Sequence, residues 1–217
     1  VFVRRGPGGP GAPAFVDEER APSTPALAQR LADEGVQLAD GQQGEVNLGI
    51  EAWLAEVARG LRRGYVLIVD YGYRAADLYS PRRGAGTLLG YAGHRVVDDP
   101  YPDVGGQDLT AHVDFTAVER AAVGLGLTPL GLTSQAEFLV GAGAEALVER
   151  VRSAPETRMA EWVALRAALG RLLDPRAMGA FKVCVLGRDV PLDPPLRGLA
   201  YRIGGPSTAT APAGDAR

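Results

Sequence analysis

Most of the side chains capable of chemistry lie in one quarter of the chain, residues 64–115. This tract opens with an apolar run that ends in Asp70-Tyr71-Gly72. The run is too short for a helix and rich in β-branched residues, which predicts a strand over 65–71 buried on both faces of a parallel sheet. Asp70 would then lie at the carboxyl end of a strand, where open α/β sheets bind ligands. A carboxylate that caps a turn is the alternative.

The same tract holds both histidines, His94 and His112, with Asp108 and Asp114 close by in sequence. Imidazole and carboxylate groups in this pattern can bind a metal, and an imidazole can also act as a general base or orient a substrate nitrogen. No HExxH motif or dense carboxylate cluster accompanies them, so we predict no metal site. A purely structural alternative has His112 and Asp114 anchoring a loop, with Asp114 as the N-cap of the next helix. The residues alone do not rank these alternatives.

A basic loop precedes the first histidine, with Arg82 and Arg83 followed by Gly84-Ala85-Gly86-Thr87. Its charge and its glycines suit an anion, although a solvated turn has the same composition.

The composition excludes several classes of protein. A chain of 217 residues with 46% hydrophobic and 23% charged residues suits one globular domain. The net charge of -3 argues against nucleic acid as a partner. No apolar run is long enough to span a membrane and no signal peptide is evident, so we expect no membrane partner and a cytoplasmic location. The only cysteine, Cys184, lies in an apolar run and is expected to be a buried thiol.

The rest of the chain alternates between helical and strand patterns, which predicts an α/β fold. Residues 204–217 lack periodicity and are expected to form a disordered tail. Capping boxes are predicted for Thr116 with Glu119 and for Ser134 with Glu137. The other predicted elements are strands over 1–3, 14–16, 127–133 and 181–186, and helices over 25–34, 50–61, 115–124, 144–151 and 156–173, with a further helix after Ser134.

Five motifs occur in an order that resembles the MidA family of S-adenosylmethionine-dependent methyltransferases. That family includes a mitochondrial assembly factor of respiratory complex I. The resemblance extends over about residues 45–185, and its motifs are DYGY (70–73), YSPRRGAGTLLGYAGHRVVDDPYP (79–102), GGQDLTAHVDFTAV (105–118), TSQAEFLVGAG (133–143) and MGAFKV (178–183).

The resemblance implies the C-terminal half of a class I, Rossmann-like methyltransferase sheet with helices on its faces. Its last three strands would lie side by side, with the final strand antiparallel between the two before it. It also implies S-adenosylmethionine as methyl donor and a protein arginine as acceptor. Within one cleft, the expected catalytic residues are His112, Asp114 and His94, and the expected substrate-binding residues are Asp70, Tyr71, Gly72, Gly86, Thr87, Asp108 and Thr110.

The chain also departs from the family. Its glycine-rich cofactor loop and Asn-Glu segment are not found, because prolines interrupt the glycines of GPGGPGAP (6–13) and no helix follows them. We therefore expect residues 1–203 to be the C-terminal portion of a methyltransferase domain, inactive alone, with an unpaired apolar edge at 65–71. The alternative function is a noncatalytic assembly module that binds a basic segment of a partner.

Overall fold

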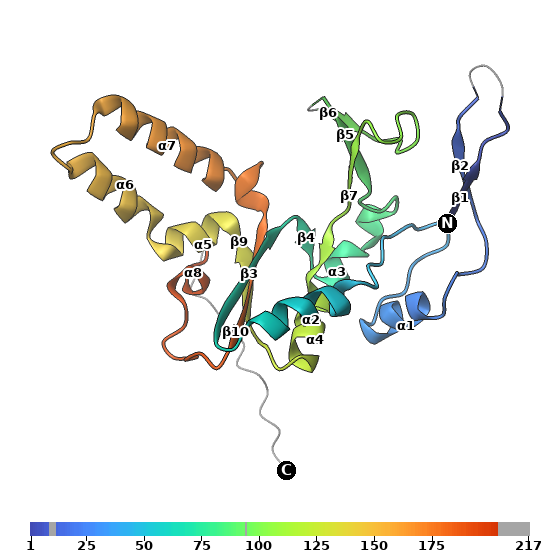
Figure 1. The fold of residues 1–217 in the computed structure, drawn as a ribbon, viewed down its shortest axis with the longest axis horizontal. Coiled ribbons are helices and arrows are strands. Elements are labelled where there is room, and N and C mark those ends of the chain that lie inside the picture. Colours follow the sequence, from blue (N-terminus) through green and yellow to red (C-terminus); the bar gives the residue numbers. More distant parts are fainter. Residues whose placement is uncertain (9–11, 94, 204–217) are drawn as a thin grey trace, which may run out of the picture. The chain divides into compact units, whose positions relative to one another are not determined.

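The computed structural model describes the chain except for residues 9–11, 94 and 204–217 (Figure 1). The predicted tail therefore lies outside the described residues, as does His94. Helices and strands mix throughout, which confirms the predicted α/β class. The chain forms two compact units, of which the first comprises Val1–Leu54 and Gly72–Ala121 and the second Ala55–Tyr71 and Ala122–Arg217.

The second unit is built on a three-stranded sheet. Its strands are β3 (Gly64–Asp70), β9 (Thr128–Ser134) and β10 (Lys182–Arg188), in the order β3-β10-β9 (Figure 1). Strand β10 runs antiparallel to both neighbours. The last strand in sequence therefore lies between the two earlier ones, as the family resemblance implied.

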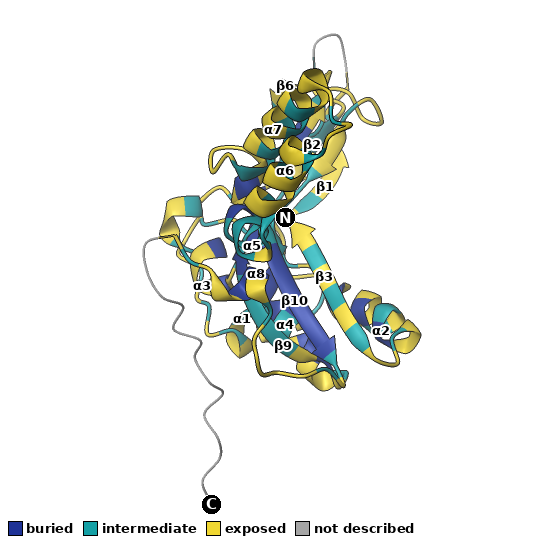
Figure 2. Ribbon diagram, turned by 90° about the vertical axis from the view of Figure 1, so that its left-hand side faces the viewer, coloured by how far each residue is buried: buried dark blue, intermediate teal, exposed yellow. Residues whose placement is uncertain are grey.

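Strand β10 is the most buried element of this sheet (Figure 2). Val183 and Val185 pack against Leu199 of α8 (Arg197–Ala200) and against Phe138 of α5 (Gln135–Ala142). Cys184 has 0% exposure, which confirms the expected buried thiol. A central strand with neighbours on both edges is where such a continuous apolar run belongs.

Strand β3 corrects one prediction. It is not buried on both faces, and its hydrogen-bonded neighbour is antiparallel rather than parallel. Tyr65, Leu67 and Val69 alternate along it and are 40%, 51% and 49% exposed. Among the described residues β3 pairs only with β10, so it is an edge strand, which confirms the unpaired apolar edge expected at 65–71 (Figure 2). An apolar, β-branched run predicts a strand, but the number of its neighbours depends on the rest of the fold.

Helix α5 begins with the predicted capping box between Ser134 and Glu137. Burial opposes ionisation of Glu137, but hydrogen bonds from Thr133, from the Ile203 N–H and from Ser134 outweigh it and lower its pKa to about 2. The Ile203 N–H donates to Glu137 Oε1 at 3.1 Å. One carboxylate thus caps a helix and also holds the end of the described chain.

Two longer helices follow α5 and lie antiparallel to each other (Figure 1). They are α6 (Ala144–Ser153) and α7 (Met159–Leu173), close to the predicted ranges. Gln135 donates hydrogen bonds to the carbonyl oxygens of Leu172 at 3.0 Å and Met178 at 2.9 Å. Met178 opens the short helix η2 (Met178–Ala180), so Gln135 joins α5 to the chain that leaves α7.

The first unit begins with a hairpin in which the two predicted strands pair, as β1 (Phe2–Arg5) and β2 (Phe15–Glu18). Helix α1 (Ala26–Asp33) follows, within the predicted range. One apolar cluster of the first unit consists of Ala75, Leu78 and Tyr79, with Leu31, Val36, Leu38, Val46 and Tyr73 packed around them. Ala75 and Leu78 belong to α3 (Ala75–Leu78).

Two small sheets in the first unit were not predicted from the sequence. Strand β4 (Gly72–Tyr73) pairs in parallel with β8 (Val113–Asp114). The other sheet has the order β6-β5-β7, formed by β5 (Leu89–Ala92), β6 (Arg95–Val97) and β7 (Asp108–Thr110). Strands this short carry too little periodicity to be recognised in a sequence. A turn of helix, η1 (Pro81–Arg83), lies between α3 and β5.

Helices α2 (Ile50–Gly60) and α4 (Phe115–Gly124) each contribute residues to both units. The predicted capping box of α4 is wrong. Asp114 Oδ1 caps the helix instead, accepting hydrogen bonds from the N–H groups of Thr116 at 2.9 Å and Ala117 at 3.2 Å. Thr116 accepts a hydrogen bond from Ala75 N–H, and Glu119 forms an ion pair with Arg74.

None of the helices within the described ranges is long and apolar enough to cross a bilayer.

Arg188 ties three chain segments of the second unit together. Its guanidinium donates to the carbonyl oxygens of Ala58 at 2.6 Å, Leu61 at 2.9 Å and Leu125 at 2.5 Å. These oxygens lie at the C-terminal ends of α2 and α4, where helices leave carbonyls without partners and a positive charge is favourable.

We expect Arg188→Ala to lower the free energy of unfolding by about 2 to 4 kcal/mol, because three carbonyl groups lose a charged donor. Urea denaturation followed by circular dichroism measures this. Arg150→Ala is the matched control, since the Arg150 side chain is exposed on α6. It should change stability by less than about 0.5 kcal/mol. Equal effects of the two substitutions would contradict the role of Arg188.

Candidate functional site

The expected site residues of the first unit centre on Thr87, which is 9% exposed. Its N–H and hydroxyl both donate to the Glu45 carboxylate, at 2.8 and 2.7 Å. Its hydroxyl oxygen accepts a hydrogen bond from the His112 N–H at 3.0 Å. One threonine therefore links the chain before α2, the loop after η1 and the segment that carries His112.

Gly86 is required by the same arrangement. Its φ of +76° lies in the left-handed region that favours glycine. A Cβ atom at this position would lie 2.2 Å from Glu45 Oε1. Gly86 and Thr87 together form the binding position of the Glu45 carboxylate: Gly86 leaves room for it and Thr87 donates hydrogen bonds to it.

His112 lies between β7 and β8, and its ring centroid is 5.4 Å from that of Tyr73. The Arg83 guanidinium lies over the Tyr73 ring, 3.8 Å from the ring centroid. Arg83 also donates a 3.4 Å hydrogen bond to Ser80 Oγ. The backbone of His112 is thus fixed by Thr87, while its ring lies beside an aromatic group in contact with a cation.

Asp114 is 5% exposed and ends strand β8. Because its Oδ1 accepts the first N–H groups of α4, the N-cap interpretation left open by the sequence is confirmed. Its Oδ2 has no hydrogen-bond partner among the described residues. The Glu34 carboxyl, at the end of α1, lies within hydrogen-bonding reach of Asp114.

Gly72 packs tightly against the strand that carries Asp114. A Cβ atom on Gly72 would lie 2.2 Å from the Val113 carbonyl oxygen and 2.7 Å from the Phe115 ring. The close approach that this glycine allows is therefore between β4 and β8.

Asp70 and Tyr71 belong to the second unit. Asp70 ends β3, is exposed, and its Oδ1 accepts a 2.8 Å hydrogen bond from the Tyr71 N–H. This is the turn contact that the alternative interpretation expects. Tyr71 is 42% exposed, and its ring centroid lies 3.8 Å from that of Phe181.

Asp108 and Thr110 lie on β7, opposite Tyr91 and Leu89 of β5. Asp108 is exposed and Thr110 half-buried. His94 lies outside the described residues. Across the described part of the chain, no three His, Cys, Asp or Glu side chains gather in a way that could hold a metal ion.

The structure thus brings Gly86, Thr87 and the His112 backbone together. Sequence reasoning missed Glu45, which lies 42 positions before Thr87 in the chain. It also missed Glu34, whose side chain has 0% exposure. A glycine before a hydroxyl residue indicated a special backbone position, but no sequence pattern identified the carboxylate that it receives.

The comparisons with known proteins agree with this fold. The family described as "Putative S-adenosyl-L-methionine-dependent methyltransferase" matches residues 4–133. A crystal structure of an uncharacterized protein from Burkholderia thailandensis is 32% identical, with a TM-score of 0.75 over 91% of this chain. A second crystal structure from that organism, of a "likely methyl transferase" bound to S-adenosyl-homocysteine, has the same identity, TM-score and coverage. No curated protein matches the chain.

The chain therefore belongs to this family of S-adenosylmethionine-dependent methyltransferases. It covers 50% and 49% of the two solved relatives, which is about half of their length.

We expect Thr87→Val to destabilise the first unit by about 1 to 3 kcal/mol, because Glu45 and the His112 N–H each lose a buried partner. Valine keeps the shape of threonine, so packing changes little. Thr87→Ser keeps the hydroxyl and should lose much less. Urea denaturation of the three proteins makes the comparison, and equal losses for valine and serine would show that the hydroxyl does not join these segments.

Proposed function

We propose that this chain forms the acceptor-binding part of an S-adenosylmethionine-dependent methyltransferase of the MidA type, and that its acceptor is a protein arginine. One observation carries most weight. A protein 32% identical over 91% of this chain is bound to S-adenosyl-homocysteine, the molecule that remains after S-adenosylmethionine has given up its methyl group. The MidA resemblance of residues 45–185 supplies the arginine acceptor.

The chemistry sets what the acceptor side has to provide. Methyl transfer breaks a sulfur–carbon bond and forms a nitrogen–carbon bond, and the acceptor nitrogen must lose a proton. A guanidinium is protonated at neutral pH. The site must therefore align the nitrogen with the methyl group and accept a proton as the new bond forms.

We assign the proton-accepting role to His112. An imidazole titrates near neutrality, which suits a general base. Thr87 fixes the His112 backbone, and Tyr73 lies beside its ring, so the base is held in place. Asp114 instead positions this segment, because one of its oxygens is committed to the cap of α4.

The remaining assignments concern substrate binding. Asp70 and Asp108 are exposed carboxylates that suit a cationic side chain. Tyr71 directly follows Asp70, and Thr110 lies two positions after Asp108, so we assign both to the same binding role. The complex I link of mitochondrial family members makes basic segments of respiratory subunits the first acceptors to test.

The first experiment is a calorimetric titration with S-adenosylmethionine. We expect this chain to bind the donor weakly or not at all, because the family's glycine-rich loop is not found in its sequence. A protein of the full length of the solved relatives that contains this chain should bind at about micromolar concentrations, a free energy near −8 kcal/mol. Micromolar binding by residues 1–217 alone would contradict this division of the site.

The second experiment replaces His112 in that longer protein. We expect His112→Ala to lower turnover about a hundredfold or more with donor affinity unchanged, since removal of a general base affects the transition state. Melting temperature, donor affinity and turnover are measured on the same variant. Wild-type turnover in a destabilised variant would assign His112 a structural role and favour the noncatalytic assembly module.

A further inference from the structure

A pair of buried carboxyl groups joins two helices of the first unit. Glu34 follows the last residue of α1, and its side chain has 0% exposure. Asp114 precedes α4 and is 5% exposed. Both Glu34 oxygens and Asp114 Oδ2 have no hydrogen-bond donor among the described residues. Two buried carboxylates in hydrogen-bonding reach repel each other unless one of them keeps a proton.

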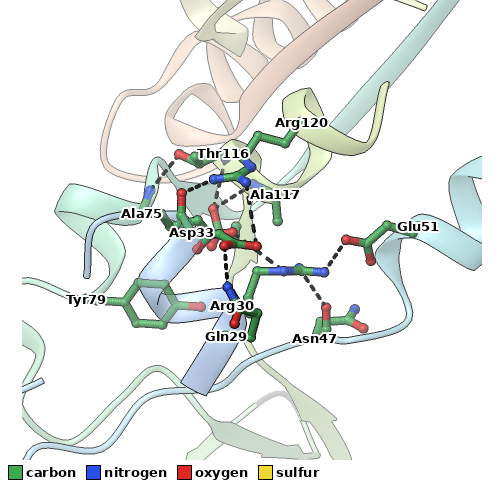
Figure 3. Close-up of polar contacts among 12 residues, drawn as sticks. Gln29, Arg30, Asp33, Asn47, Glu51, Ala75, Tyr79, Thr116, Ala117 and Arg120 are labelled. Atoms are coloured by element: carbon green, nitrogen blue, oxygen red, sulfur yellow. Dashed lines mark hydrogen bonds and ion pairs between the residues drawn. The ribbon is translucent and has the colours of Figure 1, made fainter. Parts of the chain in front are cut away.

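The neighbouring arginines do not take the place of that proton. Arg30 donates to Glu51 and to the Asn47 carbonyl oxygen, and its Nε is 3.9 Å from Glu34 Oε1, beyond hydrogen-bonding distance. Arg120, on α4, donates a hydrogen bond to the carbonyl oxygen of Asp33 and forms an ion pair with its carboxylate (Figure 3). Both guanidinium groups therefore oppose the rise in the pKa of Glu34 through their charge, without donating a hydrogen bond to it.

The neighbouring tyrosine does not supply the proton either. Tyr79 donates its hydroxyl to the Glu45 carbonyl oxygen at 3.0 Å. Burial, followed by the charges of Asp114 and Glu34 and by a hydrogen bond to Asp114, raises the pKa of Tyr79, so this hydroxyl stays protonated. Among the described residues, the other groups that act on Glu34 are thus two arginines bonded elsewhere, and the nearby tyrosine donates its proton to a carbonyl oxygen.

We propose that Glu34 and Asp114 share one proton, and that this proton latches the end of α1 to the start of α4 and is released at alkaline pH. With the proton present, Glu34 donates to Asp114 Oδ2 while Asp114 Oδ1 caps α4. Without it, two negative charges face each other in a buried position and push the helices apart. The device is a pH-sensitive latch on the segment that carries His112, and it does not depend on the proposed enzymatic activity.

The direction of the pH dependence follows from the titration of Glu34. Burial is the main reason that the pKa of Glu34 rises to about 8 from an ordinary 4.5, and the hydrogen bond and charge of Asp114 raise it further. The folded protein therefore binds a proton that the unfolded chain releases between these two pH values. Stability is full below pH 4.5 and falls as the pH rises through 8.

The test measures urea denaturation of the chain from about pH 5 to about pH 8.5. In the wild type, uptake of one proton on folding should lower the folding equilibrium constant by up to about tenfold per pH unit. Glu34→Gln carries an amide that donates to Asp114 at every pH, so this decline should disappear. Glu19→Gln is the matched control, because Glu19 is exposed, and it should decline like the wild type.

A second variant keeps the test decisive if Glu34→Gln does not fold. Asp114→Asn retains the Oδ1 cap and donates from its amide to an ionised Glu34, so the decline should be clearly smaller than in the wild type, and what remains comes from the burial of Glu34. Hydrogen exchange of the α1 amides reports the latch directly. Above about pH 8 these amides should exchange faster in the wild type than in Glu34→Gln at the same pH, and below it the two rates should agree. An equal decline in the wild type, Glu34→Gln and Asp114→Asn would overturn the proposal.

Discussion

The first unit depends on the carboxyl group of Asp114. One of its oxygens caps α4, the carboxyl group lies within hydrogen-bonding reach of Glu34 at the end of α1, and the strand that carries it packs on Gly72 without room for a side chain. His112, two residues earlier, is held to Thr87 and through it to Glu45. Segments that are far apart in sequence thus meet around a few buried oxygens. Because a buried carboxyl group without partners is costly, this arrangement tolerates little variation.

The second unit is organised differently, by apolar burial around one strand. Strand β10 has neighbours on both edges, and Val183 and Val185 pack on α5 and α8. Polar contacts fasten the periphery of this core. Arg188 gathers the carbonyl ends of α2 and α4, and Glu137 caps α5 and holds Ile203. Strand β3 lies at the edge of the sheet with Leu67 and Val69 half exposed, and an apolar edge of this kind is a natural place for another strand to add.

Family membership and geometry answer different questions about this chain. The family supplies S-adenosylmethionine chemistry, and the solved relatives are about twice as long as the residues that match here. The geometry separates residues that hold the structure from residues whose side chains are exposed. Gly86 and Gly72 must be glycines because neighbouring atoms leave no room for a side chain, and Asp114 caps a helix. Asp70 and Asp108, in contrast, are exposed. Motif residues therefore divide into a supporting group and an exposed group.

The sequence by itself determined the local elements and the family. Apolar periodicity and capping residues located the strands of the second unit, the helices over 144–151 and 156–173 and the Ser134 cap, because these depend on contacts between near neighbours in the chain. Tertiary structure decided the rest. It left one face of β3 exposed, paired β4 with β8, and placed Glu45 on Thr87 and Glu34 beside Asp114. Those pairings join residues about 40 to 80 positions apart, and a carboxylate's partner at such a distance is fixed by packing rather than by local pattern.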